Sequence, residues 1–187
     1  MNDDAARRLR LLQQEFTTLP ARGIQERGPA AVHPPAPINL AVFDHIARSV
    51  TEVVEHVHAV APDADPAPAE VARVYDWYRQ NTPELDAEEI RVREARIYRQ
   101  SLEHAIEAGD RSVIRRHPCP ACGCWGLFWR DGATAGDDDC LPRSARGRAA
   151  CTNRDCVDED GVGRTWDLAR LAHEHTARKN ETRRNAT

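Results

Sequence analysis

Apolar side chains recur along much of this chain at steps of three and four residues, the spacing of one face of an α-helix. The pattern is longest after Asn39, a residue suited to cap a helix of about twenty residues. Its apolar positions do not alternate with polar ones, so a helix is favoured over a strand. They are Phe43, Ile46, Ala47, Val50, Val53, Val54 and Val57. Because most of them are β-branched, this helix should need tertiary burial to form.

The same spacing predicts two short helices. One covers residues 5–16 and has Leu9, Leu12 and Phe16 on one face. The other ends near Asn81 and Pro83, where the chain can no longer continue a helix. Its apolar positions are Val71, Val74, Tyr75 and Tyr78.

A long helix is predicted from Asp86 to Ala108. Asp86 can cap it, because a carboxylate accepts hydrogen bonds from first-turn amides. Gly109 is placed to end it in the left-handed conformation that glycine adopts without strain. The positions expected to face inward are Ile90, Ile97, Tyr98, Leu102, Ala105 and Ile106. We expect this helix to pack with the two that precede it as a small bundle.

From His117 onward, cysteine, glycine, tryptophan and short apolar runs replace the helical spacing. Trp125 to Arg130, Arg148 to Ala150 and Thr165-Trp166 are candidate strands. A short helix should start at Asp167, with Leu168 and Leu171 on its apolar face. The predicted fold class is therefore α+β and mostly α, with a small C-terminal β unit and a short terminal helix after the helical region.

Two pairs of cysteines flank the candidate strands. Cys119 and Cys122 are separated by two residues, and Cys151 and Cys156 by four. Thiols at such spacings can point at one ion from a tight turn, and two turns can complete a tetrahedron. The sequence therefore predicts one structural Zn²⁺ ion held by these four cysteines.

Residues inside the two turns fit this prediction. Pro120 restricts φ where the first turn begins, and Gly123 permits a positive φ that lets backbone amides approach the sulfurs. In the second turn, Asn153 is a residue that tolerates the left-handed conformation. The second turn is wider than the first, and the insert 131–147 between the pairs is long. The prediction of metal ligands therefore depends more on the first pair of cysteines than on the second.

Cys-Pro-x-Cys-Gly, followed by Cys-x-Asn-x-x-Cys and a tryptophan-bearing strand, resembles the zinc-ribbon family over residues 117–170. More broadly, the chain is similar to proteins of actinobacterial prophages and integrative elements. Three segments carry that similarity: 98–105, 116–122 and 165–169. The resemblance implies a zinc ribbon and a mobile-element context, and it implies no reaction.

Proline-rich stretches and the change of pattern divide the chain. Prolines make residues 28–38 a linker and interrupt the chain again between Pro62 and Pro68. We predict an N-terminal helix and linker over 1–38, a helical bundle over 39–112, a zinc ribbon with a short helix over 113–178 and a disordered tail over 179–187.

Other interpretations of the cysteines stay open. They can be small buried apolar residues, ligands of an iron–sulfur cluster that includes Cys124, or a redox dithiol. The redox reading lacks its βαβ context. Cys124 and Cys140 are treated as spectators, and His117 as a loop histidine. If Cys156 is not a ligand, Cys124 or His117 is the expected replacement.

Charge is unevenly distributed along the 187 residues, whose net charge is −4. Residues 1–110 carry 12 basic and 19 acidic side chains, a net −7, whereas residues 111–187 carry 14 and 11, a net +3. The acidic start has no apolar stretch typical of a signal peptide, and no run approaches a membrane span. We therefore expect a cytoplasmic protein, in whose reducing environment clustered cysteines indicate metal binding.

The mildly basic C-terminal part suggests DNA or RNA as a partner. Arginines beside aromatic rings suit phosphate contact and base stacking. The predicted nucleic-acid-binding residues are Arg143, Arg146, Arg148, Arg154, Arg164 and Trp129, with Trp125 and Phe128 as further stacking faces. Asp137–Asp139 and Asp158–Asp160 offset part of this charge.

The alternative is a protein-interaction adaptor that uses the helical region, or a homodimer, without nucleic acid. Exposed valines or tyrosines on the helical stripe would favour it. An enzyme is not predicted, because the sequence has no His-Glu-x-x-His motif, no glycine-rich phosphate loop and no acid, base and nucleophile set.

Overall fold

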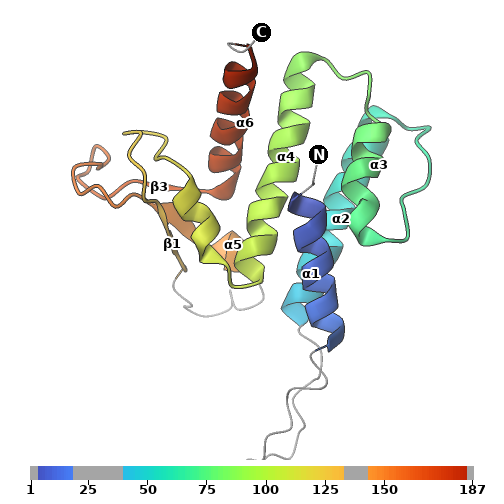
Figure 1. The fold of residues 1–187 in the computed structure, drawn as a ribbon, viewed down its shortest axis with the longest axis horizontal. Coiled ribbons are helices and arrows are strands. Elements are labelled where there is room, and N and C mark those ends of the chain that lie inside the picture. The colour runs from blue at the N-terminus through green and yellow to red at the C-terminus, as the bar shows by residue number, and fades with distance from the viewer. Residues whose placement is uncertain (1–3, 19–39, 133–142, 185–187) are drawn as a thin grey trace, which may run out of the picture.

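Helices account for most of the described residues, which are 4–18, 40–132 and 143–184 in this computed structural model (Figure 1). A three-stranded sheet lies in the C-terminal part, so the α+β, mostly α prediction is confirmed. The predicted linker 28–38, the cap residue Asn39 and Cys140 lie outside the described residues. No helix in the described ranges combines the length and the apolar character needed to cross a membrane.

The predicted elements form in the predicted order. In chain order they are α1 (Asp4–Thr18), α2 (Leu40–Val60), the 3₁₀ turn η2 (Val71–Arg73), α3 (Val74–Gln80), α4 (Ala87–Glu107), the 3₁₀ turn η3 (Arg111–Arg116), β1 (Phe128–Arg130), α5 (Arg143–Arg146), β2 (Arg148–Ala150), β3 (Thr165–Trp166) and α6 (Leu168–Arg184). The last helix is longer than predicted. It continues to Arg184, so residues 179–184 are helical where a disordered tail was expected.

The predicted ends of α4 are confirmed. The Asp86 carboxylate accepts the amides of Glu88 and Glu89, both at 2.8 Å, and the Glu89 side chain accepts the Asp86 amide. This reciprocal arrangement satisfies donors that the helix itself leaves free. At the other end, Gly109 has φ +82° and follows the cap residue Ala108.

The helices before residue 100 share one core. Apolar side chains of α1, α2, α3 and the first half of α4 meet in it; its largest fully buried members are Leu9, Leu12, Val53, Val57, Tyr75 and Tyr78. Three stripe positions were predicted wrongly, since Phe43 is 51% and Ile90 37% exposed and Ala47 is exposed as well. Val42 takes the buried place expected of Phe43, because the buried face of α2 starts one residue earlier than predicted.

A second core connects the helices to the sheet. Its members come from the second half of α4, from η3, from the strands and from α6; they include Leu102, Ile106, Ile114, Leu127, Trp129, Leu168 and Leu171. Helix α6 lies beside α4 in Figure 1, and both helices line one cleft. Helix α4 therefore contributes to both cores, and the β unit is packed onto it.

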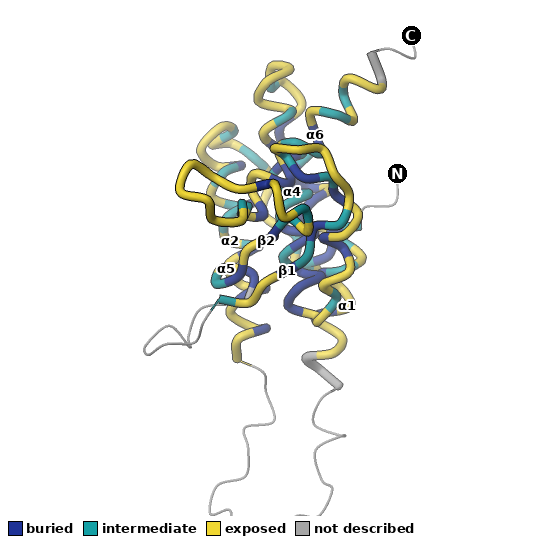
Figure 2. The backbone as a smooth tube through the Cα atoms, turned by 90° about the vertical axis from the view of Figure 1, so that its left-hand side faces the viewer, coloured by how far each residue is buried: buried dark blue, intermediate teal, exposed yellow. Residues whose placement is uncertain are grey.

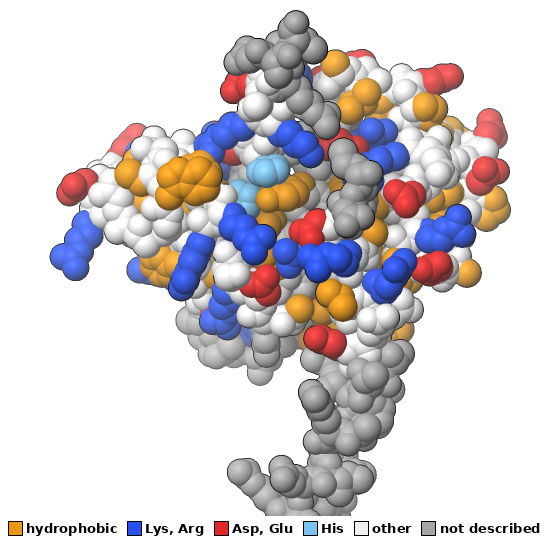
Figure 3. Space-filling model, in the orientation of Figure 1, with side chains coloured by type: hydrophobic (Ala, Val, Ile, Leu, Met, Phe, Trp, Pro, Cys, Tyr) orange, Lys and Arg blue, Asp and Glu red, His pale blue; other side chains and the backbone are white. Residues whose placement is uncertain are grey.

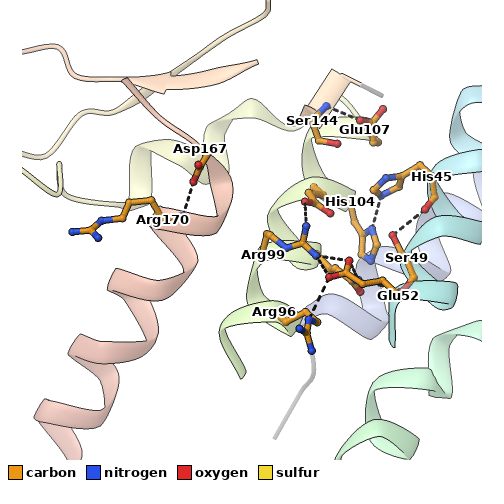
Figure 4. A network of polar contacts seen from close by, with 12 residues as sticks. His45, Ser49, Glu52, Arg96, Arg99, His104, Glu107, Ser144, Asp167 and Arg170 are labelled. Atoms are coloured by element: carbon orange, nitrogen blue, oxygen red, sulfur yellow. Dashed lines mark hydrogen bonds and ion pairs between the residues drawn. The ribbon is translucent and has the colours of Figure 1, made fainter. Parts of the chain in front are cut away.

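The sheet is antiparallel, in the order β1-β2-β3. Trp129 faces Ala149, and Ala149 in turn faces Trp166. The small Ala149 side chain is fully buried between the two tryptophan-bearing strands. A buried hydrogen bond from the Ser144 amide to the Glu107 carboxylate, 2.7 Å long, attaches α5 to the end of α4 (Figure 4).

A chain of hydrogen bonds between buried polar side chains connects the helices of the first core. His45 Nε2 lies 2.8 Å from His104 Nδ1 (Figure 4). His104 Nε2 lies 2.6 Å from the Tyr75 hydroxyl. The Tyr75 hydroxyl donates to Gln100 Oε1 at 2.7 Å. The Gln100 amide nitrogen donates to Glu52 Oε2 at 2.9 Å and to the Ser49 carbonyl. The chain thus links α2, α3 and α4.

The Glu52 end fixes the direction of every hydrogen bond in this chain. A carboxylate and a carbonyl only accept, so the Gln100 nitrogen faces them and its oxygen faces Tyr75. Because the Tyr75 hydroxyl donates to that oxygen, His104 must carry its proton on Nε2 and accept on Nδ1. His45 must then donate from Nε2. Both histidines are neutral in this arrangement, and burial lowers the pKa of each.

We predict that the neutral His45 makes stability pH-dependent. Burial lowers its pKa to about 4 from an ordinary 6.5. The unfolded chain therefore binds more protons between these values, and the stability from this group is lost as pH falls from 6.5 towards 4. His45→Gln keeps a donor that cannot ionise. Between roughly pH 7 and 5.5, the free energy of unfolding of this variant, measured with urea, should fall by about 1 kcal/mol less than that of the wild type.

The matched control is His58→Gln, at an exposed position of the same helix. It should keep the wild-type pH dependence. An unchanged pH dependence in His45→Gln would contradict the assignment of a neutral His45.

We predict that Gly147→Ala destabilises the β unit. A Cβ atom at Gly147 would lie 2.2 Å from the ring of Trp129 and 2.7 Å from the backbone oxygen of Arg130. Because the ring is buried and the oxygen belongs to a strand, neither yields easily, and overpacking of this kind costs about 1–3 kcal/mol. Gly163→Ala, where a Cβ meets nothing within 4 Å, is the control and should be close to neutral in thermal unfolding.

Candidate metal centre

Four cysteine sulfurs from two turns converge in the β unit. The Sγ atoms of Cys119, Cys122, Cys151 and Cys156 all lie within 4.8 Å of one another. Two of the separations, Cys119 to Cys156 and Cys122 to Cys151, are 3.7 Å. The structure therefore brings together the four residues that the sequence singled out, including the second pair with its wider spacing.

These separations fit a metal ion at the centre of the group. With zinc–thiolate bonds of about 2.3 Å, a regular tetrahedron has sulfur–sulfur edges of about 3.8 Å. The two 3.7 Å separations match such an edge, and the remaining ones are at most 4.8 Å. The donor set is four soft sulfurs, which suits a thiophilic ion. A single cation at the centre would be within bonding reach of all four after small adjustments.

The first turn is a tight loop closed at its base. The Cys119 amide donates to the Cys124 carbonyl and the Gly123 amide to the Cys119 carbonyl, both at 2.9 Å. Pro118 and Trp125 pair across the base of the loop as an antiparallel bridge. Gly123 has φ +71°, as predicted. The loop thus fixes Cys119 inside the second core and leaves Cys122 at the surface.

The second turn is ordered by Asn153, in a different way from the one predicted. No described residue other than glycine has a positive φ, so Asn153 is not left-handed. Its amide instead donates to Cys151 Sγ at 3.4 Å, its side-chain oxygen accepts the Asp155 amide and its carbonyl accepts the Cys156 amide. These bonds wrap the wide turn around the sulfurs without a strained backbone.

The two turns impose different conditions on their thiols. A hydrogen bond from the Cys124 amide lowers the pKa of Cys122 to about 6, so this sulfur is a thiolate at neutral pH. Burial raises the pKa of Cys156 to about 12 and also raises that of Cys151. A cation among the sulfurs would favour all four thiolates at once, because metal binding releases the thiol protons.

The residues considered as substitutes are not members of the group of four, although the Cys124 thiol contacts that of Cys122. Cys124 is exposed, and its sulfur accepts a weak contact from Asn153 Nδ2 at 3.9 Å. His117 is buried, with Nε2 3.2 Å from the Tyr98 hydroxyl. Since Cys156 belongs to the group, neither substitute is needed. Cys140 lies outside the described residues.

The predicted nucleic-acid-binding arginines differ in availability. Arg148 and Arg154 are exposed. The Arg164 Nε atom donates to the Val157 carbonyl at 2.7 Å, so this side chain supports the loop after the second turn. Arg146 is half-buried and has a partner within the protein. The side chain of Arg143 lies outside the described residues.

The prediction that Trp129 contacts nucleic acid is wrong, because the structure buries this side chain. Trp129 is only 7% exposed and packs in the second core, so its ring offers no face to a base. Trp125 is 69% exposed, at the base of the first turn. Trp129 lies in β1 and is buried in the second core with Leu127, whereas Trp125 lies outside the strand, before Gly126 with its φ of +111°.

Acidic side chains of the β unit are gathered in one hairpin. Val157 pairs with Gly163, and the Asp158 carboxylate closes the hairpin by accepting the amides of Asp160 and Val162. Nearly all of its residues are exposed (Figure 2). The acidic run 158–160 is thereby held on an exposed hairpin.

Comparisons with protein-family models, with curated proteins and with solved structures find no match to this chain.

We predict that the four-cysteine group binds one metal ion and that the β unit depends on it. Cys119→Ser, or chelation, should remove the ion and loosen the strands and α6, because Cys119 and Cys156 belong to the second core. Binding energies of small metal modules reach about 10–16 kcal/mol, so the loss should be large. Metal analysis and tryptophan fluorescence check this, since Trp129 and Trp166 lie in the affected unit.

Cys124→Ser is the matched control, because it removes a nearby thiol that is not part of the group. It should retain one ion per chain and the wild-type fluorescence. Equal metal loss in the two variants would contradict the assigned ligand set.

Proposed function

We propose that this protein binds one structural Zn²⁺ ion through Cys119, Cys122, Cys151 and Cys156 and uses the zinc-supported unit to bind nucleic acid. The observation that carries the zinc assignment is the convergence of four sulfurs with 3.7 Å edges. Four thiolates in a tetrahedron are the ligand set that structural zinc prefers. The similarity to proteins of prophages and integrative elements favours a role in a mobile genetic element.

A structural role follows from the closed coordination shell. Four protein sulfurs leave no position at which the metal can activate water. Zinc would supply the cation that holds the two turns together. We therefore propose a binding protein and no enzymatic reaction at this centre.

The distribution of charge supports nucleic acid as the partner. Basic side chains are exposed beside the metal-binding turns: Arg115, Arg116, Arg148 and Arg154. The acidic run 158–160 lies on its own projecting hairpin. Figure 3 shows many lysine and arginine side chains, with Asp and Glu side chains among them, on the face that carries α4 and α6. Exposed basic side chains attract phosphates independently of base sequence.

The helices give the protein-adaptor alternative mixed support, since Val60 of α2 is 41% and Val92 of α4 38% exposed. It called for exposed valines or tyrosines on the helical stripe. Val53 and Val57 are fully buried, and so are Tyr75 and Tyr78. These side chains form the first core and are not available to a partner.

We predict salt-dependent binding of nucleic acid by the zinc-loaded protein. Fluorescence anisotropy would follow labelled single-stranded and duplex oligonucleotides of DNA and RNA between about 50 and 200 mM salt. The affinity should fall steeply over this range, because each contacted phosphate releases counterions. The double variant Arg148→Ala/Arg154→Ala should weaken binding and flatten the salt dependence.

The matched control is Arg73→Ala, an exposed arginine in η2 on the other side of α4. It should bind as the wild type does. Absence of binding to all four oligonucleotides at low salt would rule out the nucleic-acid function and leave the zinc centre unaffected.

A further inference from the structure

A groove lies between the first metal-binding turn and helix α6. It has a volume of about 210 Å³. Arg116 and Trp125 line it from the side of the turn, and Glu174, His175 and Arg178 line it from α6. Pockets for drug-sized ligands are typically about 300–1,000 Å³, so this groove suits a smaller group, such as one base with its phosphate.

Two histidines that line the groove, His117 and His175, pack against each other and against Tyr98 of α4. The ring of His175 stacks on that of Tyr98 from α4, with centroids 4.0 Å apart and planes inclined by 12°. His117 meets the His175 ring edge-on at 5.6 Å and contacts the Tyr98 hydroxyl. Because these rings hold one another, the two histidines are preorganised and little ordering is needed when a ligand binds.

Trp125 forms one wall, and the metal-binding turn fixes its backbone. Its pairing with Pro118 closes the loop that carries Cys119 and Cys122. The side chain is nevertheless 69% exposed. A large aromatic face held beside a groove is the feature on which unstacked bases pack.

The rim of the groove is positively charged. Arg116 is exposed and has no ion pair among the described residues, and Arg178 lines the groove from α6. Glu174 is the acidic residue of the groove, and its carboxylate lies 2.8 Å from Arg170 and 3.9 Å from Arg178, so it offsets part of the charge of both arginines. Burial and then Lys179 and Arg178 lower the pKa of His175, which is consistent with a positive potential at this place.

We propose that this groove is the subsite for one nucleotide of a single-stranded nucleic acid, with the base stacked on Trp125 and the phosphate held by Arg116 and Arg178. The inference rests on the proposed nucleic-acid function and specifies where and in what form the partner binds. A single strand is favoured because its bases are free to turn outward, whereas the bases of a duplex are stacked and paired.

The two parts of the subsite have different experimental signatures. Trp125→Ala should weaken binding of a labelled single-stranded oligonucleotide by about 5- to 100-fold, the range for loss of one base–aromatic stack. It should leave the slope of log affinity against log salt unchanged. Arg116→Ala should lower that slope by about 0.7, the contribution of one phosphate contact on a single strand. Trp125→Phe should retain most of the affinity.

Matched variants separate these effects from general disturbance. Val162→Ala replaces another exposed apolar side chain of the β unit, 60% exposed on the acidic hairpin, and should leave binding unchanged. Arg73→Ala serves the same purpose for Arg116. Every variant is used zinc-loaded, with its metal content and fluorescence checked against the wild type. Binding should also quench tryptophan fluorescence, and the quenching should be absent in Trp125→Ala.

Two further ligands test the identity of the partner. Inorganic polyphosphate offers phosphates without bases, and a phosphorylated peptide offers them on a protein. If either binds as tightly as the single strand, with no loss in Trp125→Ala, base stacking in the groove is wrong. Tighter binding to duplex than to single strand also overturns the proposal.

The outcomes distinguish this subsite from the broader function. If nucleic acid binds and Trp125→Ala and Arg116→Ala bind as the wild type does, the groove assignment fails and the nucleic-acid function stands. If no nucleic acid binds under any condition, both fail.

Discussion

Four sulfurs brought within 4.8 Å of one another are the constraint on which the C-terminal half depends. Two of them, Cys119 and Cys156, are also members of the second core, beside Leu127 and Leu168. Converging thiolates repel, and burial makes the thiolate of Cys156 unfavourable. A central cation removes both penalties. The metal centre and the apolar core of this unit are therefore one cooperative structure, and strands of two or three residues can persist within it.

Helix α4 extends this dependence to the rest of the fold. Its first half closes the core of α1, α2 and α3 through Ile97, and its second half closes the core of the β unit through Leu102 and Ile106. The buried chain from His45 to Glu52 ties the same helix to α2 and α3 by hydrogen bonds whose direction is determined throughout. Loss of the metal should consequently loosen α6 and one end of α4, while the first core retains its own contacts.

Features that depend on neighbouring residues were predicted well from the sequence. Features that depend on contacts between residues distant in the sequence were predicted poorly. Asp86, Gly109 and Gly123 act on their immediate neighbours, so composition and spacing were sufficient to place them. The cysteine pairs were identified for the same reason. The stripe of α2 was displaced by one residue at Phe43, because helical spacing alone does not say which of two adjacent positions a partner covers. The chain of His45, His104 and Tyr75 joins three helices distant in sequence, and no local pattern marks it.

The two tryptophans explain why the proposed stacking residue is Trp125 and not Trp129. Trp125 and Trp129 are only four residues apart, yet Trp129 is buried in strand β1 and Trp125 is exposed at the base of the first turn. The groove beside Trp125 exists only because α6 folds back along α4, an arrangement set by Leu168 and Leu171 in the second core. Trp125 is a member of neither core. A large ring that contributes so little to burial, next to an arginine with no ion pair in the described part of the chain, is the arrangement that the proposed stacking of a base on Trp125 requires.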